Sequence, residues 1–249
     1  MSYVIAVAGK GGTGKTTLAG LIIRILSEKK SGSILAVDAD PNNNLGEALG
    51  VSIDETIGSI LDEIAAHPEK IPAGFTKDRY VEYRVEQAIK EDDRFDIISM
   101  GRPEGPGCYC FVNNVLRNVI SKLISSYDFV VIDNEAGLEH FSRRTTRKAD
   151  CLLVVSDPTR VGLLSAKRIR ALSEELGIKL EKKLLVVNRS RGEISDAVND
   201  AGLDFIGSLP YDNEIEKAAV KGDSLFNIDK NSNILDNLGK IGDKIWQRK

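Results

Sequence analysis

Short apolar runs alternate with stretches of helical period along most of the chain. The apolar runs are rich in Val, Ile and Leu and have the length of strands, and they are Tyr3–Ala8, Ile34–Asp38, Phe95–Met100, Phe129–Asp133, Cys151–Ser156, Lys183–Asn188 and Asp204–Leu209. Because these runs are nearly continuously apolar, we expect strands that are buried on both sides in a mostly parallel sheet. The pattern therefore predicts an α/β fold with a central sheet and helices on both faces.

The stretches between the apolar runs have the spacing of amphipathic helices. Apolar positions three and four residues apart predict helices at Lys15–Glu28, Phe111–Ser126, Leu163–Leu176, Ile194–Ala201 and Asn213–Lys221. Residues 54–94 are charged and weakly patterned, and they form either a surface that selects a partner protein or an ordinary helical addition. No linker rich in proline or serine divides the 249 residues, so we expect one domain over residues 1–249.

A phosphate-binding loop follows the first predicted strand. Its sequence, GKGGTGKTT at residues 9–17, lies directly between that strand and a predicted helix. In such a loop the backbone N–H groups surround the phosphates, Lys15 contacts the β- and γ-phosphates, and the Thr16 hydroxyl binds Mg²⁺. The sequence therefore predicts a P-loop NTPase, whose nucleotide contacts are Gly11, Gly12, Thr13, Gly14, Lys15, Thr16 and Thr17.

A second lysine, Lys10, stands directly after the first glycine of this loop. An ordinary phosphate-binding loop needs no cation at that position. Lys10 could extend out of its own subunit and bring positive charge to the phosphates of a nucleotide held by a facing subunit. The alternative is a lysine that is simply solvated at the surface.

Carboxylates end two of the predicted strands. One strand runs into Asp38-Ala-Asp40-Pro, and another ends at Asp133, with Gly137 in the loop that follows. Parallel sheets bind ligands at the carboxyl ends of their strands, so we expect these acids beside the Mg²⁺ of the triphosphate. One acid could hold a metal-bound water, another could orient the attacking water, and the backbone N–H of Gly137 could contact the γ-phosphate. The alternative for Asp38 and Asp40 is a polar turn, since Asp-Pro often begins one.

Two cysteines, Cys108 and Cys110, are separated by one residue in a Gly-Pro-Gly-Cys-Tyr-Cys segment between a predicted strand and a predicted helix. Two such thiols can chelate a soft or borderline metal ion, but they supply only half of a four-ligand site. A two-fold dimer would place the same pair opposite itself and complete the site. The alternative is that these cysteines pack beside the helix. The third cysteine, Cys151, begins an apolar strand and is predicted to lie in the core.

The sequence KGGTGKT at residues 10–16 resembles the deviant Walker A loop of the Min- and partition-type ATPases, a class that includes the nitrogenase iron protein. Three further segments accompany it: DADP at residues 38–41, CYC at residues 108–110 and DNEAGLEH at residues 133–140. Together they resemble the nickel-insertion ATPases of the CooC type, which mature carbon monoxide dehydrogenase and acetyl-CoA synthase. The likeness extends over nearly the whole chain.

This resemblance implies a nucleotide chemistry. Members of the class hold ATP between two subunits, so it implies ATP and Mg²⁺ as ligands of a homodimer whose interface Lys10 crosses. It implies that Asp40 acts in hydrolysis and that Asp38 contacts Mg²⁺ or water, with Asp133 as the Walker B aspartate. Asn188 and Pro210 correspond to the residues that lie beside adenine in these relatives. The alternative is that each belongs to an ordinary turn after a strand.

The resemblance also implies a metal and a partner. In the CooC-type ATPases the paired cysteines of two subunits bind Ni²⁺ or Zn²⁺, so Cys108 and Cys110 would do so here. Nucleotide binding would drive dimer formation and delivery of nickel to an acceptor, either carbon monoxide dehydrogenase or acetyl-CoA synthase. An iron–sulfur electron carrier is disfavoured, because Leu138-Glu-His140 stands where the nitrogenase iron protein supplies a cysteine ligand. His140 is either an additional metal ligand or a structural histidine.

A positioning or partition ATPase, which binds a membrane or DNA, is the second interpretation. Its membrane form needs an amphipathic anchor, and residues 234–246 have a helical period, but two glycines and mixed charges there favour a packing helix. The formal net charge of −3 gives no general attraction to nucleic acid. A metabolic ATP-using enzyme is a third interpretation, and it would need a second substrate pocket. Neither the membrane form nor the DNA form of a positioning ATPase explains the paired cysteines.

The chain has no apolar run long enough to span a bilayer and no recognisable signal peptide. Three cysteines cannot form a complete set of disulfides, which favours a reducing compartment. We therefore expect a cytoplasmic protein that binds neither a membrane nor nucleic acid.

Overall fold

The computed structural model describes residues 2–101, 110–135, 148–192 and 194–246, and of residues 110–117 only the backbone. Its strands are β1 (Tyr3–Gly9), β2 (Ile34–Asp38), β3 (Lys90–Glu91), β4 (Asp96–Ser99), β5 (Phe129–Asp133), β6 (Lys148–Ser156), β7 (Lys179–Ser190) and β8 (Asp204–Pro210). They form one sheet in the order β3-β4-β2-β5-β1-β6-β7-β8, in which every neighbouring pair is parallel except β3 and β4. The carboxyl ends of the parallel strands therefore share one edge of the sheet.

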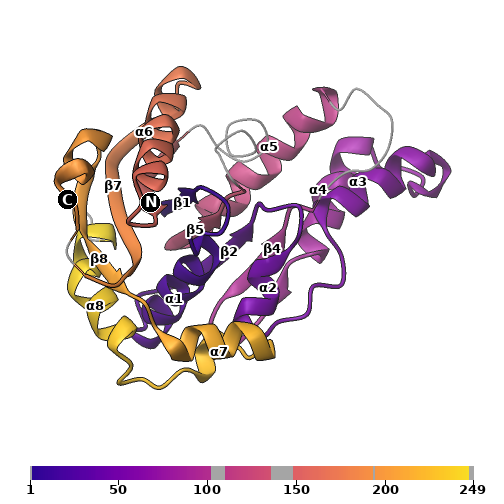
Figure 1. Ribbon diagram of the computed structural model, residues 1–249. Coiled ribbons are helices and arrows are strands. Elements are labelled where there is room, and N and C mark those ends of the chain that lie inside the picture. Colours follow the sequence, from indigo (N-terminus) through magenta and orange to yellow (C-terminus); the bar gives the residue numbers. More distant parts are fainter. Residues whose placement is uncertain (1, 102–109, 136–147, 193, 247–249) are drawn as a thin grey trace.

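Helices lie on both faces of this sheet (Figure 1). One face packs against α1 (Lys15–Glu28), α2 (Asn44–Leu49), the short turn η4 (Leu225–Asn227) and α8 (Asn233–Trp246). The other packs against α3 (Ile57–Ala66), α4 (Lys77–Gln87), α5 (Cys110–Ser125), α6 (Arg160–Glu175) and the 3₁₀ helix η3 (Asp196–Ala201). The other elements in the described residues are η1 (Pro68–Lys70) and α7 (Asn213–Lys221).

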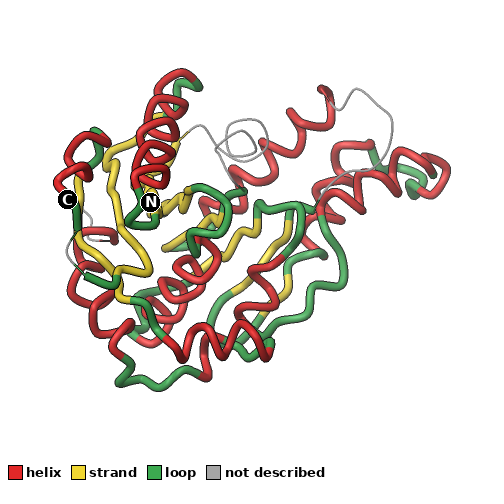
Figure 2. Tube along the Cα trace, in the orientation of Figure 1, coloured by secondary structure: helices red, strands yellow, loops and turns green. Residues whose placement is uncertain are grey.

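The alternation of side chains along the strands produces this layering. In β1, Val4, Ala6 and Ala8 join the core under α3 to α6, whereas Ile5 and Val7 join the core under α1 and α8. A strand that is apolar on both faces can be covered only by helices on both sides. The predicted α/β fold with a mostly parallel sheet is thus confirmed, and the trace in Figure 2 shows the strands lying between the two groups of helices.

The observed element boundaries differ most from the predicted ones where charged residues interrupt the apolar pattern. The predicted limits of β2, α1 and α7 are confirmed. Strands β6 and β7 begin earlier than predicted, because Lys148 pairs with Lys179 and extends the ladder through alternating polar residues. The predicted helix at residues 194–201 is a shorter 3₁₀ helix, and α2 and β3 were not predicted.

Residues 54–94 are mainly helical. Thr56 caps α3 by a capping box with Ser59, and the Thr76 side chain accepts a hydrogen bond at the start of α4. Helix α3 buries an apolar face, whereas α4 buries little besides Val81 and Val85. This segment is therefore a helical addition over the β3–β4 end of the sheet, and its role in selecting a partner stays a prediction.

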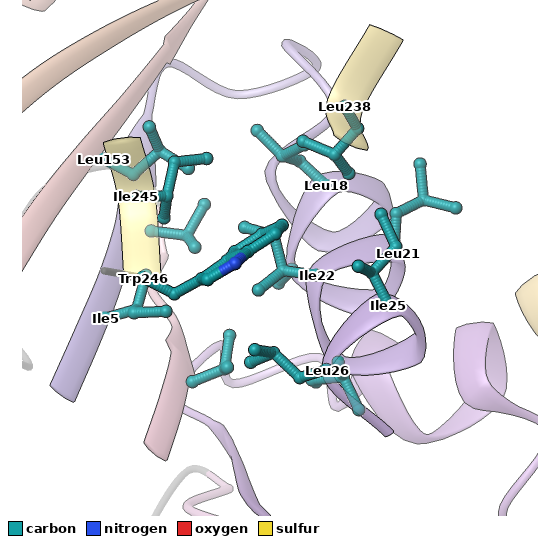
Figure 3. Packing of buried hydrophobic residues seen from close by; sticks show 14 of the residues in the cluster. Ile5, Leu18, Leu21, Ile22, Ile25, Leu26, Leu153, Leu238, Ile245 and Trp246 are labelled. Carbon is teal, nitrogen blue, oxygen red and sulfur yellow. The ribbon is translucent and has the colours of Figure 1, made fainter. Parts of the chain in front are cut away.

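Helix α8 packs into the core through its apolar face. Figure 3 shows Trp246 between Ile5 of β1 and Ile22 of α1, with Leu238 and Ile245 directed into the same cluster. A Cβ on Gly242 would lie 2.0 Å from the Trp246 indole, so only glycine at position 242 leaves room for that ring. The prediction of a packing helix is confirmed. Among the described helices, none combines the length and the apolar character that crossing a membrane requires.

Candidate nucleotide site

The phosphate-binding loop connects β1 to α1 at the carboxyl edge of the sheet. Gly12 and Gly14 have φ angles of 79° and 89°, a left-handed conformation that side chains rarely permit, and α1 begins directly afterwards at Lys15. A Cβ on Gly9 would lie 2.3 Å from the carbonyl oxygen of Val155 in the adjacent strand β6. The glycines therefore allow the turn and its close approach to the sheet, and α1 directs its N-terminus at the loop.

The two lysines of the loop have different environments. Lys15 is 8% exposed, and its ammonium lies 3.4 Å from the carbonyl oxygen of Lys10. The Lys10 side chain is exposed at the surface of the loop. The Lys15 ammonium is thus held against the backbone of the loop, whereas the Lys10 side chain is accessible from outside.

Two buried carboxylates lie side by side at the ends of the neighbouring strands β2 and β5. Asp38 and Asp133 are register partners in these strands, and both side chains are completely buried. Asp38 accepts hydrogen bonds from the backbone N–H groups of Asp40 at 3.1 Å and Leu45 at 2.8 Å. Burial nevertheless raises the pKa of Asp38 to about 6, because the two backbone donors only partly replace the lost water.

Asp133 is the less satisfied of the two acids. Neither of its buried carboxylate oxygens has a hydrogen-bond partner among the described residues. Burial raises its pKa to about 7, and the charge of Asp38 adds to this effect, while the Thr16 hydroxyl and the Lys15 ammonium oppose it. A divalent cation next to Thr16 would neutralise this carboxylate pair, so the donor set fits Mg²⁺.

Asp40 lies just beyond the end of β2 and is partly exposed. One of its carboxylate oxygens accepts hydrogen bonds from the backbone N–H and the side-chain amide of Asn42, both at 2.9 Å. The Asp-Pro turn, the alternative structure for this segment, is therefore present. This turn does not move Asp40 away from the strand ends, and Asp40 lies at the same sheet edge as Asp38 and Asp133.

A cleft of about 320 Å³ adjoins the loop on the side of β7 and β8. Asn188 and Pro210, the predicted adenine-side residues, both line it together with Gly14 and Thr17 of the loop. The Asn188 side chain donates a hydrogen bond to the carbonyl oxygen of Thr13 at 2.9 Å. The tertiary structure thus brings these two distant strand ends to the loop.

Two residues of this cleft make contacts that were not predicted. The Arg189 guanidinium donates a hydrogen bond to the carbonyl oxygen of Gly12 at 2.9 Å. Tyr211, which also lines the cleft, lies under the Arg191 guanidinium at 4.3 Å from its ring centroid and donates a hydrogen bond to Glu216. Their positions after Asn188 and Pro210 were the available signal, but contacts between separate loops are not encoded in local spacing.

Several predicted site residues fall outside the described parts of the chain. Gly137, His140 and Cys108 lie in undescribed segments, and Cys110 is described only as the first backbone position of α5. The described residues contain no group of three or more His, Cys, Asp and Glu side chains that could hold a metal ion. The paired-cysteine metal site therefore stays a prediction. Cys151, by contrast, is completely buried in β6, as expected.

The loop at the start of α1, the buried aspartates at neighbouring strand ends and the adjoining cleft define a P-loop nucleoside triphosphatase. The chain belongs to the family of the CobQ/CobB/MinD/ParA nucleotide binding domain, which matches residues 4–225. It is accordingly a P-loop ATPase, and ATP with Mg²⁺ fits its site.

Individual relatives cover almost the entire chain. An uncharacterized ATP-binding protein of Methanocaldococcus jannaschii is 44% identical over 99% of both chains. The carbon monoxide dehydrogenase accessory protein CooC of Rhodospirillum rubrum is 32% identical over 90% of this chain and 89% of its own. The solved structure of the cell division ATPase MinD of Pyrococcus furiosus is similar with a TM-score of 0.72, at 24% identity and 98% coverage of both chains. That last likeness supports the fold alone.

Proposed function

We propose that this protein is an ATP-hydrolysing metallochaperone that binds nickel through Cys108 and Cys110 and promotes its insertion into carbon monoxide dehydrogenase or acetyl-CoA synthase. The observation that carries the proposal is the Cys-x-Cys pair in a chain 32% identical to the accessory protein CooC over nine-tenths of its length. Nickel is the cargo in this proposal, whereas Mg²⁺ serves the nucleotide.

In the nucleotide half, ATP binds with its phosphates in the loop and its base in the cleft between Asn188 and Pro210. Lys15 contacts the β- and γ-phosphates, and Asp133 with Thr16 holds Mg²⁺. The buried Asp133 carboxylate supports this role, because its unpartnered oxygens are costly to keep unless a cation neutralises them. The other loop contacts come from the backbone of Gly11, Gly12, Thr13 and Gly14 and from Thr17.

Hydrolysis depends on residues at the edges of this site. Asp40 orients the attacking water, and Asp38 contacts Mg²⁺ through water. Lys10 reaches the nucleotide of a second subunit, and its exposure on the loop supports that role. Gly137 contacts the γ-phosphate by its backbone N–H, so hydrolysis would change the segment that follows β5.

In the metal half, two copies of the chain contribute two thiolates each. The Cys-x-Cys segment follows β4, whose Ser99 is the register partner of Asp38, and it leads into α5. A change at the nucleotide edge would therefore reach the cysteines through the β2–β4 ladder and the few residues that follow Ser99. ATP would close the dimer and form the four-thiolate site, and hydrolysis would loosen that site toward the acceptor.

A positioning ATPase of the MinD or partition type is the second candidate. The family match and the fold likeness to MinD favour it. Its membrane form lacks support in α8, because the apolar face of that helix is buried against α1 and β1. Neither form gives the paired cysteines a role.

The deciding experiment is a titration of the protein with Ni²⁺ in the presence and absence of ATP, with oligomeric state followed by light scattering. We expect about one Ni²⁺ per two chains, bound more tightly or more weakly when ATP is present. The double variant C108S/C110S should lose nickel and keep ATP. The control is C151A, which removes a buried thiol and should bind nickel normally. Dimer formation by ATP that is indifferent to nickel and to C108S/C110S would instead favour the positioning ATPases.

The nucleotide assignments have separate tests. K15A should abolish ATP binding, and unchanged affinity would contradict the assignment of the phosphate-binding loop. D40A should bind ATP, form the dimer and fail to hydrolyse, so that a long-lived ATP dimer accumulates. Normal turnover by D40A would remove Asp40 from catalysis.

A further inference from the structure

We propose that the Thr13 hydroxyl is a positioning group for Lys10, and that it fixes the backbone from which this lysine reaches a second subunit. The inference rests on the proposed role of Lys10 in turnover and is independent of the metal. Its basis is an arrangement of three donors around one carbonyl oxygen of the loop.

The carbonyl oxygen of Lys10 is the point where the loop closes on itself. It accepts a hydrogen bond from the Thr13 hydroxyl at 2.9 Å and a longer one from the Thr13 backbone N–H at 3.3 Å. The Lys15 ammonium is a third donor at 3.4 Å. The hydroxyl makes the shortest of these contacts and therefore contributes most to the orientation of the Lys10 peptide.

Thr13 itself is held rigidly. It is 1% exposed, and its own carbonyl oxygen accepts the hydrogen bond from Asn188. A Cβ on Gly9 would lie 2.9 Å from the Thr13 hydroxyl oxygen, so glycine at position 9 leaves room for that hydroxyl. Thr13 thus connects the cleft side of the loop to the peptide of Lys10.

The hydroxyl becomes more important when a nucleotide is bound. A lysine that contacts the β- and γ-phosphates has to turn its ammonium toward them, so Lys15 gives up its contact with the Lys10 carbonyl oxygen. Thr13 then supplies the only side-chain donor described at that oxygen. Valine has nearly the same shape as threonine but no donor, and it would leave the Lys10 peptide freer to rotate.

The test compares ATP turnover by the wild type, T13V, T13S, K10A and the double variant T13V/K10A. We expect T13V to lower kcat about tenfold with KM nearly unchanged, because a displaced catalytic charge affects the transition state more than binding. T13S keeps the hydroxyl and should restore most of kcat. When K10A is already present, adding T13V should lower kcat by less than about twofold, since the two groups act through one interaction. T13A, which has no donor either, replaces T13V if that variant does not fold.

The outcomes separate this inference from the proposal that supports it. Normal turnover by K10A would overturn the role of Lys10 and this inference with it. Reduced turnover by K10A with normal turnover by T13V would overturn the inference alone. Additive losses in T13V/K10A, or a rise in KM that accounts for the whole effect of T13V, would also overturn it.

Discussion

The carboxylates at the nucleotide edge of the sheet and a carboxylate of helix α3 differ in burial and in the direction in which their pKa values are shifted. Asp38 and Asp133 are completely buried, and burial raises the pKa of each. Glu63 of α3 is partly exposed and paired with Arg84 of α4 at 2.9 Å, and this guanidinium lowers the pKa of Glu63. In the first region Asp133 has no hydrogen-bond partner among the described residues and Asp38 has only two backbone donors, whereas in the second region Glu63 shares its charge with an arginine at the surface.

The difference distinguishes acids that destabilise the fold unless a ligand binds them from acids that stabilise it slightly. A buried carboxylate without a partner destabilises the fold, so its presence at a strand end indicates a ligand of opposite charge. A surface carboxylate paired with an arginine makes a small favourable contribution and needs no ligand. Exchanging these charges for neutral side chains should therefore change stability in opposite directions in the two regions.

The largest effect is expected for D133N. This variant removes the charge that holds Mg²⁺ in the proposed function, so ATP turnover should fall about 100-fold or more. The nucleotide-free protein at pH 8 should become more stable by about 2–4 kcal/mol, since each pKa unit corresponds to about 1.4 kcal/mol. Turnover assays and urea unfolding of the same preparation measure both effects.

The control for D133N is D150N. Asp150 is also buried, but it accepts a hydrogen bond from the backbone N–H of Val4 at 2.6 Å. Replacement of this satisfied carboxylate should give no gain in stability. An equal gain in both variants, or none in D133N, would contradict the assignment of Asp133 as an unpaired buried acid.

An intermediate effect is expected from pH. The folded state holds the protons of Asp133 and Asp38 up to about pH 7 and about pH 6, whereas the unfolded chain loses them near pH 4. The folded state therefore binds more protons between these values, and these groups lower the free energy of unfolding as pH rises from about 4 to about 7. Unfolding of the wild type relative to D133N should show this loss, which should level off above pH 7.

In the α3–α4 region the free energy of unfolding should depend on pH in the opposite direction. The pKa of Glu63 is lowered in the folded state, so its contribution is present above its ordinary pKa and is lost as pH falls below that value. The variant E63Q should therefore differ from the wild type at neutral pH and converge with it in acid. A difference that grows in acid would contradict the pairing with Arg84.

The smallest effect is expected for R84Q. The Arg84 side chain is 15% exposed and pairs with Glu55 at 2.5 Å and Glu63 at 2.9 Å. Its loss should cost about 1 kcal/mol, less in 1 M salt, and should leave ATP turnover unchanged. R79Q, on the exposed face of the same helix, is the control and should unfold like the wild type. A large loss of turnover in R84Q would connect α4 to the nucleotide site.

The fold could be predicted well where one strong local signal dominates. Helix α1 and strand β2 have the predicted limits, because an unbroken apolar pattern and a glycine loop define them. Helices α3 and α4 could not be delimited in advance. Charged residues surround the short apolar face of α3, and α4 depends on its cap at Thr76 and on the contacts of Arg84 more than on apolar burial.

The candidate site divides in the same way. The loop residues and the acids at 38, 40 and 133 were predicted, because phosphate and Mg²⁺ chemistry needs those residue types at those strand ends. The contact of Arg189 with Gly12 and the packing of Tyr211 under Arg191 were not, since each joins loops whose relative position depends on strand order.

The sequence by itself thus determined the phosphate-binding loop, the buried strands and the acids that follow them, because backbone geometry and side-chain period act over a few residues. Only the tertiary structure decided that Asp38 faces Asp133 and that Asn188 holds the carbonyl oxygen of Thr13, 175 positions away in the chain. Strand order and register set those contacts, and both depend on the packing of the whole sheet rather than on any local pattern.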